Sequence, residues 1–272
     1  EDANGNSTNG KVAEKATTYV YAIGEIEARF PTMSIEKEFA QASGRSDTSG
    51  LTDNQLMYEV LKKPENRYLR RNLCWVMKVQ GIETYIVLPR YAQDYELLVE
   101  TLPSNPDKKE VDVVIGALGP VAKPQMCNGL QVPIVVVDQL YSFRLEEHAQ
   151  AIPRPDNFKA KDFDPAAMEL FSRVMQITDN AGATDEHRAL NYVAMRYPAI
   201  YELAMNMYGN ENSLASIETR PSRLSQGTRK ILGVKFSFRN RKTDVLTQYF
   251  TRVDVSGEFP FLVSKLAEGF EN

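Results

Sequence analysis

Alternating apolar and polar residues predict β-strands through the first half of the chain. From Tyr19 to Phe30 the apolar side chains fall on one side of a two-residue period and the charged ones on the other, which is typical of a half-buried strand. Two segments, Leu73 to Val79 and Thr84 to Leu88, flank a turn and predict a hairpin. The most apolar segments, Val111 to Leu118 and Val132 to Phe143, predict central strands buried on both faces.

Apolar residues spaced three and four positions apart predict helices elsewhere. The region 164–208 repeats this spacing, and Asp164 followed by Pro165 is typical of the start of a helix. Shorter helices are predicted near 34–43, 52–63, 92–101 and 145–151.

The C-terminal part predicts a second hairpin, with strands over 231–238 and 245–255 joined by a polar turn. A last helix is predicted over 260–270. Strands come first, helices follow, and a hairpin closes the chain, an order that favours an α+β fold over regular βαβ winding. We therefore expect an α+β fold with a mixed or antiparallel sheet, helices packed on it, and a C-terminal β-hairpin plus helix.

The domain organisation follows from composition along the chain. Residues 1–18 are rich in Asn, Gly, Ser, Thr and Lys, and we interpret them as a flexible linker or tail. Residues 19–272 are predicted to form a single domain, and a two-lobed arrangement with a boundary in the Pro-rich loop at 153–157 is the alternative. Because the chain does not begin with Met, we expect a piece of a longer polypeptide or a processed form.

Composition and charge narrow the function classes. The chain has 272 residues, 43% of them hydrophobic and 25% charged, which is ordinary for a globular protein. The net charge of −4 gives no electrostatic case for nucleic acid. The aliphatic run Val132 to Val137 is far shorter than the roughly 20 residues that cross a bilayer. Only two cysteines, 53 residues apart, favour a reduced compartment. We expect a cytoplasmic protein with neither a nucleic-acid nor a membrane partner.

Cysteine and histidine give only weak indications of a metal or catalytic site. Among Cys74, Cys127, His148 and His187 no two lie closer than 21 residues, whereas structural zinc sites use close pairs. We predict that both histidines are solvated on helix surfaces, that Cys74 is a buried apolar residue, and that Cys127 is the more exposed thiol. Metal binding or thiol chemistry at Cys127 with either histidine stays open as an alternative.

Short catalytic motifs fail for physical reasons. Residues 5–12 match most of a phosphate-binding loop, but Val12 replaces the Ser or Thr that would hold magnesium, and no strand precedes them. Dinucleotide, serine-hydrolase, zincin and calcium-loop patterns do not occur. We assign no catalytic residue and no cofactor.

One segment stands out by its charge. Residues 219–243 contain eight basic and no acidic side chains. Alternation in the strand places Lys235 and Arg239 on one face and Val234, Phe236 and Phe238 on the other. The functional interpretation is a binding surface for an acidic partner, and the alternative is a solvated face that protects a strand from aggregation. The candidate binding residues are Arg229, Lys230, Lys235, Arg239, Arg241 and Lys242.

Several long segments carry a family resemblance. Together they resemble the C-terminal domain of unknown function of cyanobactin biosynthesis proteins, which follows the macrocyclase in PatG-like proteins and has a relative after the protease in PatA-like proteins. The resemblance spans roughly residues 19–272. It rests on Tyr19 to Gln41 (YVYAIGEIEARFPTMSIEKEFAQ), Arg67 to Arg90 (RYLRRNLCWVMKVQGIETYIVLPR), Val111 to Pro120, Met126 to Phe143 (MCNGLQVPIVVVDQLYSF), Asn191 to Ala204 and Arg229 to Leu266.

The resemblance implies a setting rather than a reaction. In the parent proteins, subtilisin-like domains cut and macrocyclise ribosomal precursor peptides, and some parents carry a thiazoline oxidase; the motifs of both are missing here. We expect a non-catalytic interaction or scaffolding domain of a patellamide-like pathway. Its expected partners are other domains of the same polypeptide, the cyanobactin precursor peptide, and a second copy in a homodimer. The alternative is an unrecognised enzyme or metal-dependent module that acts on the precursor peptide.

Overall fold

Five strands in the first half of the chain close into a barrel. The computed structural model describes residues 17–47, 49–102, 110–144, 147–148, 151, 160–176 and 179–269. The barrel order is first, second, third, fifth, fourth, and the fourth strand pairs back to the first. The strands are β1 (Tyr19–Arg29), β2 (Cys74–Val79), β3 (Ile82–Pro89), β4 (Glu110–Val121) and β5 (Pro133–Arg144).

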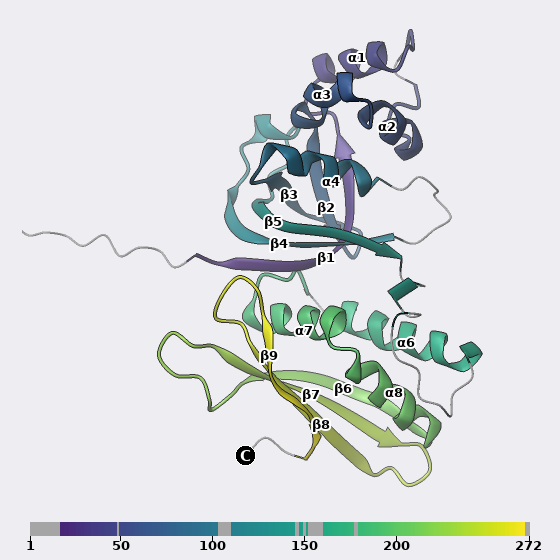
Figure 1. Cartoon of the computed structure of the whole chain (residues 1–272), viewed down its shortest axis with the longest axis vertical. Helices are drawn as coiled ribbons and strands as arrows, with labels where there is room; N and C mark the ends of the chain where they lie inside the picture. Colours follow the sequence, from purple (N-terminus) through teal and green to yellow (C-terminus); the bar gives the residue numbers. More distant parts are fainter. Residues whose placement is uncertain are drawn as a thin grey trace, which may run out of the picture.

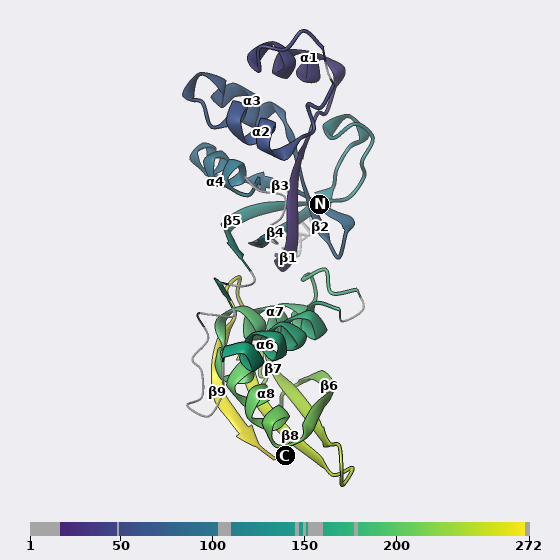
Figure 2. The same ribbon diagram turned by 90° about the vertical axis from the view of Figure 1, so that its right-hand side faces the viewer.

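All barrel neighbours are antiparallel except β3 and β5, which are parallel. This order is that of OB-fold barrels. Short helices lie at the end of the barrel far from the second sheet (Figures 1 and 2) and complete a core around Phe39, Leu69 and Trp75. They are α1 (Met33–Ala42), α2 (Asn54–Leu61), η1 (Pro64–Asn66), α3 (Arg67–Asn72), η2 (Ala92–Asp94) and α4 (Tyr95–Glu100), and η3 (Pro124–Met126) lies in the β4–β5 connection.

Strand β1 changes partner in its middle, pairing with β4 up to Gly24 and with β2 from Glu25. A Cβ on Gly24 would lie 2.1 Å from the Lys78 carbonyl oxygen, so only glycine allows the strands to approach this closely. Next to this change of partner, the buried Asp112 carboxylate accepts a hydrogen bond from the Ile26 N–H (2.7 Å). Burial raises the pKa of Asp112 to about 7.

The second half of the chain forms a four-stranded antiparallel sheet with helices on one face. The sheet order follows the chain order, so its first and last strands are its two edges. The elements are α6 (Ala160–Met175), α7 (Asp185–Arg196), α8 (Ala199–Gly209), β6 (Asn212–Pro221), β7 (Ile231–Asn240), β8 (Leu246–Asp254) and β9 (Phe261–Glu268).

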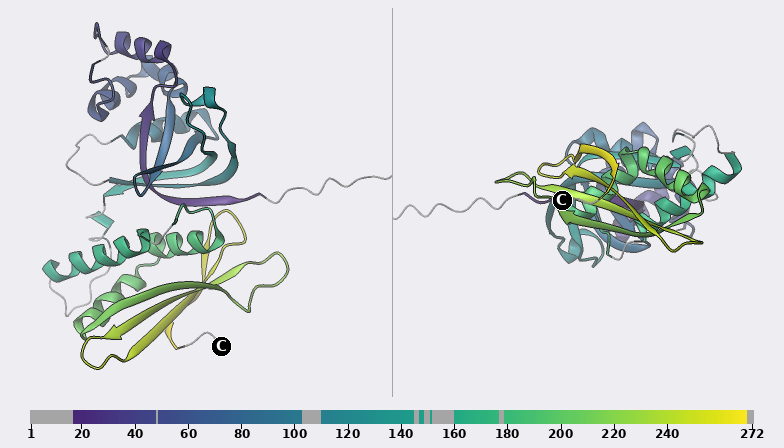
Figure 3. Two further views of the ribbon diagram at one scale, coloured as in Figure 1. Left: turned by 180° about the vertical axis from the view of Figure 1, so that it is seen from behind. Right: turned by 90° about the horizontal axis from the view of Figure 1, so that it is seen from below.

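The helices α6 to α8 lie in a layer between this sheet and the barrel (Figure 3). One buried cluster joins all three layers, with Ile23 and Val113 from the barrel, Val193 from α7, and Val234 and Phe236 from β7. Because the barrel and the sheet share this core, we propose that residues 19–272 fold as one unit. The alternative boundary at 153–157 and residues 1–16 of the tail lie outside the described residues.

The α+β prediction is confirmed, with a mixed barrel sheet and the β7–β8 hairpin. Two details were wrong. The segment predicted as a final helix is β9, because its apolar residues also suit a strand and β8 offers a free edge to pair with. Helix α6 begins at Ala160, so Asp164 does not start it. Within the described chain no helix is long and apolar enough to cross a membrane.

A close backbone contact joins the barrel to the helical layer. The Tyr21 N–H donates to the Gly182 carbonyl (2.9 Å), and the Asn191 side-chain amide donates to the Tyr21 carbonyl (2.7 Å). Asn180 donates to Asn191 in turn (2.8 Å), and both asparagines are fully buried. Gly182 has a φ of +75°, and a Cβ there would lie 2.1 Å from the Tyr21 oxygen.

Replacing Gly182 by alanine should therefore destabilise the protein strongly. Gly227→Ala is the matched control, since Gly227 also has a positive φ but no atom within 4 Å of the added Cβ. We expect about 1 kcal/mol for the control from backbone strain alone. For Gly182→Ala we expect about 3 kcal/mol or more, because two buried hydrogen bonds are displaced as well. Urea unfolding measures both, and equal losses would contradict the role given to this contact.

Candidate functional site

The two cysteines form a disulfide between β2 and the connection that follows β4. Their Cα atoms lie 5.6 Å apart, and both residues are buried. The prediction of Cys127 as the more exposed thiol is therefore wrong, and thiol chemistry has no free sulfur in this state. Strand pairing brought together two residues that are 53 positions apart in the chain. The disulfide removes the argument from reduced cysteines, and the cytoplasmic compartment stays a prediction without it.

The disulfide belongs to a small apolar cluster on the outer side of the barrel. Val76 and Ile86 lie beneath it, and Leu130, Val132 and Ile134 pack at its border. The segment 122–132 is thereby fastened over β2 and β3.

The histidines lie elsewhere and do not meet Cys127. The His148 ring packs against Phe143 (5.2 Å between centroids), Tyr201 (5.9 Å) and Phe171 (6.0 Å), so the prediction of a solvated surface histidine was wrong for His148. Burial lowers the pKa values of His148 and of His187, which lies in the first turn of α7. Across the described ranges no three His, Cys, Asp or Glu residues are grouped as metal ligands would be.

The basic segment has the predicted alternation, with Val234, Phe236 and Phe238 buried and Arg239 exposed. Five of the six candidate residues form ion pairs with acidic residues, and all five partners lie outside 219–243. The sequence pattern therefore overstates the free positive charge. The pairs are Arg229 with Asp254 (2.8 Å), Lys230 with Asp185 (2.8 Å), Lys235 with Glu218 (2.9 Å), Arg239 with Asp244 (2.9 Å) and Lys242 with Glu211 (2.6 Å).

Arg241 is the sixth residue and differs from the others. Its guanidinium lies over the Tyr208 ring, 4.7 Å from the centroid, and donates to the Tyr208 carbonyl (3.1 Å). The pairing elsewhere also has an electrostatic effect, since the hydrogen bond and charge of Lys235 lower the pKa of Glu218. The proposal that this surface binds an acidic partner thus depends most on Arg241.

The two edge strands of the second sheet, β6 and β9, differ in how their outward backbone groups are covered. At β9, the Leu262 N–H donates to the Tyr192 hydroxyl (3.1 Å) and the Leu266 N–H to the Tyr197 hydroxyl (2.8 Å). Tyr192 of α7 and Tyr197, which directly follows α7, cover the backbone of that edge. At β6, no further strand pairs with the edge in the part of the chain that the structure describes.

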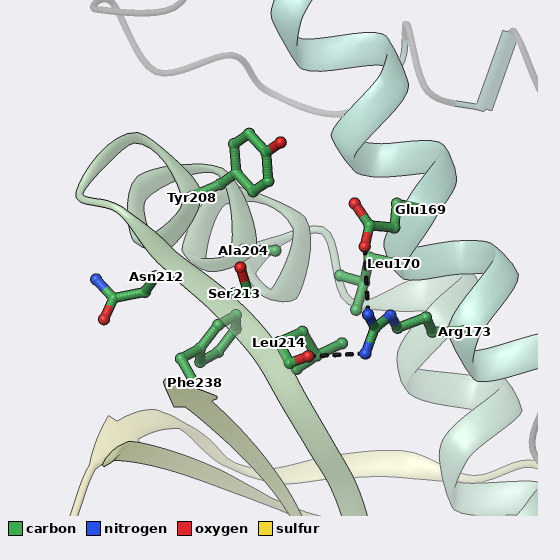
Figure 4. Close-up of a pocket in the computed structure, with 9 residues that line it drawn as sticks. All are labelled: Glu169, Leu170, Arg173, Ala204, Tyr208, Asn212, Ser213, Leu214 and Phe238. Atoms are coloured by element: carbon green, nitrogen blue, oxygen red, sulfur yellow. Dashed lines mark hydrogen bonds and ion pairs between the residues drawn. The ribbon is translucent and has the colours of Figure 1, made fainter. Parts of the chain in front are cut away.

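A groove runs along the free edge of β6, between this strand and the helices α6 and α8 (Figure 4). Leu170, Ala204, Leu214 and Phe238 line its apolar part, and its cavity volume is about 30 Å³. A second hollow continues along β6 to Ile217 and shares residues with the first. Together the two hollows follow β6 from Asn212 to Ile217.

Arg173 lies where the two hollows meet. Its guanidinium donates to the Leu214 carbonyl of β6 (2.7 Å) and pairs with Glu169 one turn earlier on α6 (3.5 Å), as the dashed lines in Figure 4 show. The Leu214 carbonyl therefore points away from β7, toward the groove. A side-chain donor there occupies the position that a backbone N–H of an added strand would take.

Comparison with known proteins assigns this chain to a family. The family model described as PatG Domain matches residues 19–220. The chain belongs to the PatG domain family. It is also similar to the solved structure titled "PatG Domain of Unknown Function", with 20% sequence identity, 93% of this chain and 99% of that chain covered, and a TM-score of 0.74. At this identity the likeness shows the fold. No curated protein sequence matches the chain.

The groove of this PatG domain was not predicted from its sequence because β6 was not predicted. A bulge between Leu214 and Ser216 interrupts the two-residue period, and the strand carries few apolar residues. The available signal was the spacing of Glu169 and Arg173, four positions apart, which predicts a neighbouring pair on one helix face.

Breaking the disulfide of this PatG domain should lower its stability. A cross-link between residues 53 positions apart restricts the unfolded chain, which corresponds to about 4 kcal/mol. Urea unfolding with and without a reductant measures the difference. Thiol titration of the unfolded, non-reduced protein is the control and should find no free thiol. Two free thiols per chain, or the same unfolding midpoint in reductant, would contradict the bond.

Proposed function

We propose that this PatG domain is a non-catalytic module of a cyanobactin biosynthesis protein and that it binds an extended segment of the ribosomal precursor peptide. The observation that carries the proposal is the contrast between the edges of the second sheet. Tyr192 and Tyr197 cover β9, whereas β6 faces a groove.

An open strand offers backbone groups to an incoming chain. Every other residue of an edge strand directs its N–H and C=O away from the sheet, and an extended peptide can pair with them as an added strand. The bulge at Leu214 to Ser216 keeps the edge from matching another flat edge, which restricts uncontrolled pairing.

The groove also offers a site for a side chain of the peptide. Leu170 and Ala204 from the helices and Phe238 from β7 form an apolar lining directly beside β6. Main-chain pairing would supply affinity for many sequences, and the apolar lining would select a residue of suitable size. This combination suits a precursor peptide whose segments differ in sequence.

The barrel supports the same choice of partner. OB-type barrels bind oligonucleotides on the face of their second and third strands. Here segment 122–132 covers part of that face, and Arg29 forms ion pairs with Glu27 and Glu83 beside it. Lys78 pairs with Glu27 as well. A peptide at β6 is therefore the better supported partner, and a strand from a neighbouring domain or a second copy would compete for the same edge.

Filling the groove should weaken peptide binding. We expect Ala204→Phe to weaken the binding of overlapping precursor peptides, measured by fluorescence anisotropy, by about tenfold or more. Ala267→Phe is the matched control, because Ala267 is exposed on the covered β9 edge. Thermal unfolding checks that both variants fold.

Two results would contradict the proposal. If the wild type binds no precursor peptide at low salt, the domain does not recognise this partner, and light scattering then shows whether the edge pairs with a second copy. If Ala204→Phe binds as the wild type does, the peptide site lies elsewhere.

A further inference from the structure

The Arg241–Tyr208 pair lies at the end of the proposed peptide groove. Tyr208 lines the groove from the last turn of α8, and Asn212 begins β6 close by. Figure 4 shows the Tyr208 ring at the rim of the groove, away from the apolar lining of Leu170 and Leu214. Any chain that pairs along β6 toward its N-terminal end leaves the groove past this ring.

Among the described residues at this end of the groove, one positive charge has no acidic partner. Arg239 at the end of β7 pairs with Asp244, Lys242 in the turn of Arg241 pairs with Glu211, and Arg173 pairs with Glu169. Arg241 has an aromatic ring and a carbonyl in place of a carboxylate. Within the described part of the chain, Arg241 therefore contributes the uncompensated positive charge of this rim.

The guanidinium has donors left for a ligand. Arginine has five N–H donors in a planar fork, and the bond to the Tyr208 carbonyl uses one amino group. Contact with the Tyr208 ring holds the plane of the guanidinium, so that less side-chain entropy is lost when a carboxylate binds. Arg241 is exposed, and Tyr208 is 46% exposed, so both are accessible from solvent.

We infer that Arg241 and Tyr208 form a subsite for an acidic side chain of the bound peptide. The inference rests on the proposed function. Its partner is an extended peptide that pairs antiparallel to β6, as each strand of this sheet pairs with the next. In that direction the chain reaches Arg241 after the apolar lining, so the acidic residue follows the residue held in the groove on its C-terminal side.

The test compares three synthetic peptides of one extended sequence against the full chain. One carries Glu on the C-terminal side of the groove residue, the second carries Gln there, and the third carries Glu on the N-terminal side. We expect the C-terminal Glu peptide to bind about fivefold more tightly than the Gln peptide at low salt, with the difference lost at high salt. Arg241→Gln should equalise these two affinities and leave binding of the Gln peptide unchanged.

Arg239→Gln is the matched control, because it removes an equal charge two positions away at the end of β7, where Asp244 already neutralises it. We expect this variant to keep the preference for the C-terminal Glu. Equal binding of the Glu and Gln peptides to the wild type would overturn the inference and leave the proposed function standing. A preference for Glu at either end, or its loss in both variants, would overturn it too, since general charge attraction would then suffice. If no peptide binds, the proposed function itself fails.

Discussion

The contact of Tyr21 with Gly182 and Asn191 is the constraint on which the arrangement of this domain depends. The first half of β1 pairs with β4 on one side only, so its other side would expose backbone groups within a buried layer. Gly182 and Asn191 satisfy these groups at Tyr21 and fix the start of α7 against the barrel. The layer of helices and the second sheet are positioned from this point.

The position of α7 then decides which sheet edge is available. Tyr192 of α7 and Tyr197 at its C-terminal end reach the backbone of β9, so the helix that packs on the barrel also covers one edge of the sheet. The opposite edge is left beside α6 and α8, with Arg173 as its described side-chain contact. In this account the barrel serves as a support, and the second sheet is the binding element.

Elements with a clear local pattern of apolar residues were predicted correctly from the sequence. Predictions were wrong where contacts between distant residues determine the structure. The apolar run around Val113 and Val114 was correctly taken as a strand buried on both faces, because these neighbours enter different clusters. The segment 261–268 fits a helix or a strand by periodicity, and only the free edge of β8 decides. Likewise Cys74 and Cys127 meet only because the barrel closes, which no local spacing shows.

The candidate site was predicted in part. The basic turn that holds Arg241 was identified from its composition. Three of the five acidic partners come from α7, β8 and the α8–β6 turn and could not be read from the segment, whereas Glu218 and Asp244 directly flank it. The groove itself lacks a sequence signal of its own, because its walls are ordinary apolar residues from separate elements. Recognition by an open strand depends on what the fold leaves unpaired, and that is a property of the tertiary structure.

Backbone hydrogen exchange tests the central claim, that a peptide adds to β6, most directly. An added strand would protect the outward amides between Ser213 and Thr219 from exchange with solvent. The account predicts that precursor peptide slows exchange in β6 while β9 and the outer face of the barrel stay unchanged. Peptide that binds without slowing exchange in β6, or that protects β9 or β2 instead, would contradict it.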